Sequence, residues 1–130
     1  MRERGRWFWH IAAGLVVLPL LALHMAIMHL DQTLGLLNPA GGHPIDWANV
    51  VARGQRLFFT ITYPILLGAA LYHGLYGFRT ILFELQPTAW LKRTISAALL
   101  VVGVALFAIG LWAALTAHSV AKATAATIGG

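Results

Sequence analysis

Histidine is the residue type in this 130-residue chain best suited to bind a metal or a prosthetic group. Cysteine is absent, which excludes thiolate zinc sites and cysteine-ligated iron–sulfur clusters on this chain. His24 and His73 lie deep within long uncharged stretches, where a polar side chain is costly and therefore marks a candidate functional site. The other four lie near the ends of such stretches or outside them: His10, His29, His43 and His118.

The surroundings of His73 favour haem over zinc, because no cysteine and no second-shell acid accompany it. A haem inside a membrane needs a neutral imidazole and small residues that let the porphyrin approach the backbone. Gly74 and Gly77 follow His73, and Gly77, four residues on, shares its helix face. The alternative is a histidine that hydrogen-bonds across a helix interface beside a helix-packing glycine pair. His10 and His29 are assigned to the membrane interface.

The composition indicates that a membrane positions these residues. The chain is 59% hydrophobic and 10% charged, whereas soluble domains are about 45–50% apolar and about 25% charged. So short a chain could not bury that much apolar surface in a core of its own. The net charge of +5 is scattered over segment ends and forms no stripe, which argues against a nucleic-acid partner.

Three stretches lack Asp, Glu, Lys and Arg: 7–30, 57–78 and 94–121. Each exceeds the roughly 20 residues that a helix needs to cross a bilayer core, and none alternates as a barrel strand would. The sequence therefore predicts an all-α membrane protein with three transmembrane helices in a single domain. The predicted spans are about 7–30, 57–82 and 92–117, joined by an outer loop at 31–56 and an inner turn at 83–91.

Lys and Arg set the predicted direction. Six of the nine lie at the N-terminus or near the second turn, against three in the first loop and the tail. This bias places the N-terminus inside, in the cytoplasm, and the C-terminus outside. Within the outer loop, residues 45–55 are expected to form a short surface helix with Asp46 near its start. The segment after His118 is expected to fray.

Residue spacing separates the two histidines within the spans. His73 lies six residues from Arg79, roughly 9 Å below the inner edge, and His24 lies seven residues from Asp31, roughly 10 Å below the outer edge. In a core of about 30 Å their depths differ by roughly 11 Å. Two axial nitrogens on one iron lie only about 4 Å apart. His73 would therefore need a second ligand from another chain, and His24 would serve its own haem or another role.

The stretch LYHGLYGFRTILFE at 71–84 resembles the second transmembrane helix of the small membrane-anchor (cytochrome b) subunits of succinate dehydrogenase (succinate:quinone oxidoreductase, complex II). That family shows a His-Gly-x-x-Gly-x-Arg pattern followed by an acidic residue near the inner surface. The chain length, the three spans and the inside N-terminus fit the family as well. The matching residues, in order and spacing, are His73, Gly74, Gly77, Arg79 and Glu84.

The resemblance implies a subunit of an electron-transport complex of the tricarboxylic acid cycle, in the cell's inner (cytoplasmic) membrane. Such an anchor pairs with a second membrane-anchor subunit and carries an iron–sulfur subunit and a flavoprotein subunit on the inner face. Succinate is oxidised at the flavin, so this chain would not be catalytic on its own. Electrons then reach a quinone bound at the inner membrane edge.

The resemblance also implies roles for individual residues. His73 corresponds to an axial ligand of the iron of haem b, and His24 has the depth for a second, outer haem in some branches. Gly74, Gly77 and Arg79 would lie beside the porphyrin or its propionates. The residues expected near the quinone are Arg79, Glu84 and Trp90.

One position departs from the family, because Leu85 stands where many members carry a tyrosine that hydrogen-bonds the quinone. No tyrosine ligand is therefore carried over. Two other functions fit the residues. One is a haem b anchor of another quinone-linked dehydrogenase or of a fumarate reductase, which differs in its soluble partner. The other is a structural membrane subunit without a cofactor.

Overall fold

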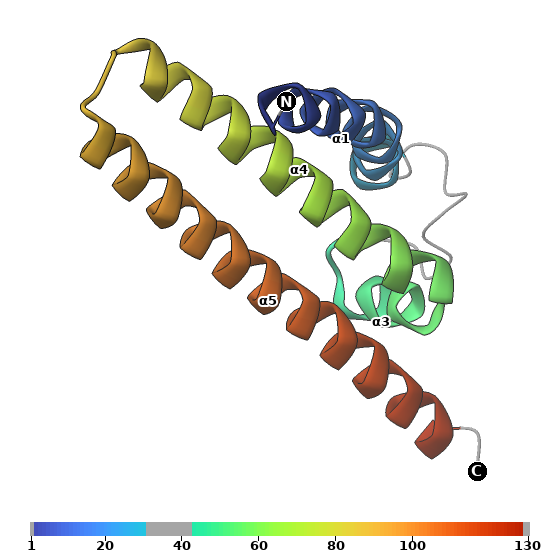
Figure 1. Cartoon of the computed structure of the whole chain (residues 1–130). Helices are drawn as coiled ribbons and strands as arrows, with labels where there is room; N and C mark the ends of the chain where they lie inside the picture. The colour runs from blue at the N-terminus through green and yellow to red at the C-terminus, as the bar shows by residue number, and fades with distance from the viewer. Residues whose placement is uncertain (1, 31–42, 129–130) are drawn as a thin grey trace.

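The computed structural model describes residues 2–30 and 43–128, and in these ranges it is built of helices and short connections, without strands (Figure 1). The predicted all-α class is confirmed. The helices are α1 (Arg2–Met25), which continues into a π-helical turn η1 (Ala26–Leu30), then α3 (Trp47–Gln55), α4 (Leu57–Glu84) and α5 (Ala89–Ile128). Three helical segments are long and apolar enough to cross a membrane: Arg4–His29, Leu57–Glu84 and Ala89–Ala123.

The first two spans begin and end within three residues of the predicted positions, but the last helix is longer than predicted. α5 continues through Ile128, so the expectation of a frayed segment after His118 is wrong. Packing explains the extra turns, because Ala121 is fully buried and its carbonyl accepts a hydrogen bond from Gln55 Nε2 at 3.3 Å. The first part of the predicted outer loop, 31–42, lies outside the described residues.

The short surface helix predicted in the outer loop is confirmed as α3. Asp46 precedes it, and its carboxylate accepts a hydrogen bond from the backbone N–H of His43 at 2.8 Å, which closes the turn before the helix. Asn49 Nδ2 donates to the His43 carbonyl at 3.0 Å. The buried Arg53 donates to the Pro44 carbonyl. Polar side chains of α3 thus tie down the backbone that leads into it.

The three spans form an open row with α4 in the middle (Figure 1). α1 and α5 each pack antiparallel against α4, and in the described part of the chain they do not contact each other. α3 lies across α5 and the beginning of α4. This row buries few side chains, and its large apolar residues are mostly exposed. The helices therefore need a bilayer or another membrane chain to cover their faces.

Small residues set the contact between α4 and α5. A Cβ atom built on Gly103 would lie 2.7 Å from Leu75 Cδ1, and one built on Gly68 would lie 3.1 Å from Phe107 Cε2. Glycine lets each of these side chains rest against the opposite backbone, as is common in membrane helix pairs. The two helices are joined by a short turn in which Gln86 takes a positive φ of 51°.

Candidate functional site

His73 and His10 meet face to face where α1 crosses α4. Their ring centroids are 4.2 Å apart and their planes differ by 6°. His73 Nδ1 also lies 3.1 Å from the backbone carbonyl oxygen of His10. Because a carbonyl oxygen can only accept, this contact places the ring hydrogen of His73 on Nδ1 and leaves the lone pair on Nε2.

Glycines on each helix make room for the imidazole of the other. A Cβ atom on Gly14 would lie 3.0 Å from His73 Cε1 and 3.1 Å from its Nδ1. One on Gly77 would lie 3.4 Å from His10 Cε1. Gly74 has no such neighbour within 4 Å and faces open space. Gly77 thus lies on the α1-facing side together with His73, whereas Gly74 does not contribute to this contact.

Sequence reasoning missed Gly14 and treated His10 only as an interfacial residue, although a signal for both was present. His10 and Gly14 are four residues apart on α1, just as His73 and Gly77 are on α4. Residues at this spacing share a helix face. Because the two helices are antiparallel, the repeated spacing brings each histidine against the glycine of the other helix.

The stacked histidines are not arranged as two axial ligands of one iron. Axial imidazoles point one nitrogen each at the metal from opposite sides, whereas these rings lie parallel and face to face at 4.2 Å. His10 Nδ1 is buried and has no hydrogen-bond partner among the described residues. His73 could hold a haem iron through Nε2, and a second ligand would have to come from another chain.

His24 lies far from this pair, towards the other end of α4. Its ring packs edge-on against Tyr63 with the centroids 5.9 Å apart. Tyr63 precedes His73 by ten residues, which is about 15 Å along α4. One iron therefore cannot take both His24 and His73 of the same chain.

His24 has surroundings that are typical of a functional site. Its Nδ1 is buried without a hydrogen-bond partner in the described part of the chain. It borders a cavity of about 270 Å³ whose lining also includes Arg53 and Tyr63. The π-helical turn η1 begins two residues later, and such turns are frequent at functional sites.

The other residues predicted for the site do not gather around His73. Arg79 faces α5, where its Nε donates to Ser96 Oγ at 3.0 Å, and its guanidinium carbon lies 4.1 Å from the centre of the Phe83 ring. Glu84 ends α4 and is exposed. Trp90, 72% exposed, lies in the first turn of α5. The structure thus places His73 on the α1 side of α4 and Arg79 on its α5 side.

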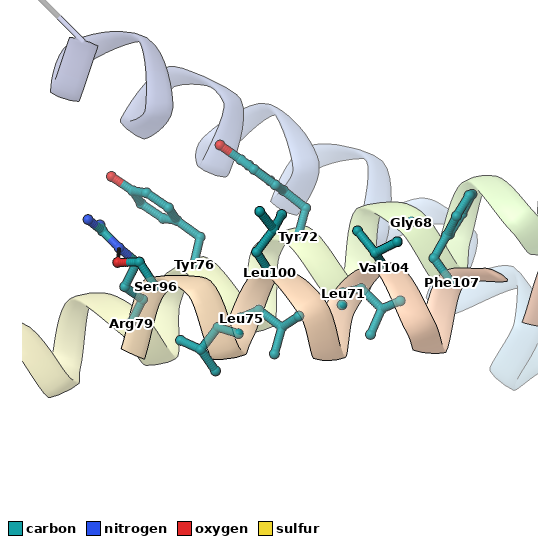
Figure 2. A pocket seen from close by; sticks show the side chains of 12 residues that line it. Gly68, Leu71, Tyr72, Leu75, Tyr76, Arg79, Ser96, Leu100, Val104 and Phe107 are labelled. Carbon is teal, nitrogen blue, oxygen red and sulfur yellow. Dashed lines mark hydrogen bonds between the residues drawn. The ribbon is translucent and has the colours of Figure 1, made fainter. Parts of the chain in front are cut away.

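A groove of about 320 Å³ runs between α4 and α5 beside Arg79 (Figure 2). Figure 2 shows Arg79, Ser96 and Tyr76 together at one end and Gly68 and Phe107 at the other. The wall between these ends is formed by aliphatic side chains and by Tyr72. We call this feature the α4–α5 groove; its lining comprises Gly68, Leu71, Tyr72, Leu75, Tyr76, Arg79, Ser96, Leu99, Leu100, Gly103, Val104 and Phe107.

No protein-family model matches the chain, and comparison with curated proteins and with solved structures gives no match. Within the described ranges, no three His, Cys, Asp or Glu side chains gather as a set that could hold a metal ion. The fold alone does not identify the function, which depends on the chemistry of the site. The site can supply one oriented imidazole, that of His73, at a helix crossing within a multi-pass membrane protein.

Proposed function

We propose that this chain is the membrane-anchor subunit of a succinate:quinone oxidoreductase in the cell's inner (cytoplasmic) membrane. In that role it helps to bind haem b and quinone, and it docks the iron–sulfur and flavoprotein subunits so that electrons from succinate reach the quinone pool. His73 carries the proposal. It begins the motif that resembles the family's second span, and its Nε2 lone pair is free of the contact that Nδ1 makes with His10.

The residues around His73 suit a haem ligand. The hydrogen bond from Nδ1 to the His10 carbonyl orients the ring and makes Nε2 more basic, which is the second-shell arrangement common for metal-bound histidines. Gly14 lets the imidazole lie close to α1. Haem b, when bound, supplies a one-electron carrier. A further ligand to the haem would come from the second membrane-anchor subunit, because His10 is stacked on His73.

The open row of helices supports a role as one subunit of a larger membrane assembly. α1 and α5 pack only on α4 among the described spans, so their outer faces are free for a second anchor. At the turn between α4 and α5, Leu85 and Trp90 are 78% and 72% exposed, next to the basic Lys92 and Arg93. An exposed apolar tip with basic neighbours suits docking of a soluble subunit.

A difference spectrum of the purified complex tests the haem ligand. We expect a b-type spectrum, reduced minus oxidised, when the complex is isolated through this chain and its subunits are identified. His73→Gln should lose the haem that His73 ligates, while its amide can still donate to the His10 carbonyl and support assembly. His29→Gln is the control, because it changes an exposed histidine at the end of the first span and should keep the full haem content. Unchanged haem content in His73→Gln would refute the assignment.

The role of His24 determines whether the complex holds one haem or two. If His24 ligates an outer haem, His24→Gln lowers the haem count from two to one and leaves the haem held by His73 in place. A complex that holds one haem and keeps it in His24→Gln excludes the second haem. The cavity beside His24 would then have another role.

A second candidate is a structural membrane subunit without a cofactor. The observation in its favour is that His73 already has partners within the chain, through its stacking on His10 and its hydrogen bond across the α1–α4 interface. A colourless complex would support this function. A haem-containing complex with different soluble subunits would instead identify another quinone-linked dehydrogenase or a fumarate reductase.

A further inference from the structure

We propose that the α4–α5 groove binds an anionic phospholipid, with one acyl chain in the groove and the phosphate on the guanidinium of Arg79. This inference does not depend on the proposed function. It rests on the charge at one end of the groove, on the apolar character of the remainder and on the length of the groove.

Arg79 is a half-buried cation at one end of the groove. Its Nε donates to Ser96 and its guanidinium carbon lies over the Phe83 ring, but it forms no ion pair with the carboxylates that the structure describes. Lys92 brings a second positive charge, with its Nζ 5.7 Å from the centre of the same ring. Two cations beside an apolar surface favour an anionic ligand. A phosphate matches best, because the terminal amino groups of a guanidinium can bind two of its oxygens at once.

The length of the groove matches one leaflet of a bilayer. Arg79 and Gly68 line its two ends and are eleven residues apart on α4, which is about 16 Å. Half of a hydrocarbon core is about 15 Å. A ligand that fits therefore has one charged end and an apolar body one leaflet long.

Other occupants fit less well. A transmembrane helix is about 10–12 Å across with its side chains and would not enter a space of this size. A free phosphate would leave the apolar wall uncovered, and a neutral quinone would leave the charge of Arg79 without compensation. A phospholipid satisfies both the cation and the apolar wall.

Native mass spectrometry of the full chain, with whatever subunits co-purify, tests this proposal. The delipidated protein is titrated with phosphatidylglycerol or with phosphatidylcholine, and the affinity for the first bound lipid is measured. We expect phosphatidylglycerol to bind about tenfold more tightly, because its net charge is not offset within its own headgroup. Arg79→Gln should remove this preference. Arg93→Gln removes an exposed cation at the same end but outside the groove and should leave the preference unchanged.

The acyl chain is tested on the other wall. Val104→Trp should fill the groove and weaken the binding of both lipids, whereas Val102→Trp, an exposed position on α5 outside the groove, should not. Equal binding of the two lipids, equal effects of Arg79→Gln and Arg93→Gln, or unchanged binding in Val104→Trp would each overturn the proposal. So would loss of a membrane subunit in Val104→Trp with lipid binding intact, which would identify a protein contact. If Arg79→Gln does not fold, the two valine variants decide alone.

Discussion

At the scale of single residues, the pair of His73 and His10 shows how a polar group can be accommodated within a membrane span. His73 donates to the backbone carbonyl of His10 on α1, and each imidazole packs against a glycine of the opposite helix. The arrangement satisfies Nδ1 and leaves Nε2 without a hydrogen bond among the described residues. A side chain in place of Gly14 would press on the His73 ring, which carries Nε2.

Alanine substitutions at two glycines test this packing. Gly14→Ala would bring a Cβ atom to 3.0 Å from His73 Cε1, so we expect overpacking to destabilise the protein by about 1–3 kcal/mol. Gly74→Ala adds a methyl group where nothing lies within 4 Å, and its better helix propensity should be neutral or stabilising by up to about 1 kcal/mol. Thermal unfolding followed by circular dichroism in one detergent compares them. Equal shifts in the two variants would contradict the contact between His73 and Gly14.

The site was predicted from sequence only in part. His73 was found because a histidine within an uncharged span is conspicuous whatever the tertiary structure. Its contact with His10 and the separation of Arg79 from it depend on which faces of α4 meet α1 and α5. Apolar residues surround α4 on nearly every side, so the hydrophobic pattern does not select those faces.

At the scale of elements, α3 and the end of α5 stabilise each other. His118 Nδ1 lies 2.6 Å from the Gly54 carbonyl oxygen and 3.2 Å from Thr60 Oγ1, so it links the last turns of α5 to both α3 and α4. The stretches without charged residues predicted where the spans begin, but they did not predict where α5 ends. The alanine-rich segment after His118 has high helix propensity, and its small side chains allow α3 to pack closely.

Removal of the His118 side chain should loosen α3. We expect His118→Ala to cost about 1 kcal/mol, the net value of one hydrogen bond, and so to speed amide exchange over 47–55 about fivefold. Hydrogen exchange read by mass spectrometry measures this rate. Ser119→Ala is the matched control, because within the described ranges Ser119 Oγ donates only to the Thr116 carbonyl of its own helix. Unchanged exchange in His118→Ala would mean that the apolar contacts of α3 suffice without this link.

At the scale of the whole molecule, the open row of three spans leaves the described part of the chain without a closed core of its own. The number of spans follows from composition and length, because three uncharged stretches each exceed the thickness of a bilayer. Their arrangement in a row does not follow from the sequence, because packing at glycines and not hydrophobic periodicity sets the contacts between the helices. The same openness that leaves room for a partner chain leaves the α4–α5 groove accessible to lipid.

The direction of the chain across the membrane is open to a direct test, because the protein has no cysteine of its own. The excess of Lys and Arg predicts that the α4–α5 turn faces the cytoplasm and α3 faces outward. We therefore expect a membrane-impermeant maleimide to label Ala48→Cys in intact cells, since Ala48 is exposed on α3. Thr88→Cys, exposed in the turn, should react only after the cells are broken. The opposite pattern would invert the chain and move Arg79, with the phosphate-binding end of its groove, to the outer leaflet.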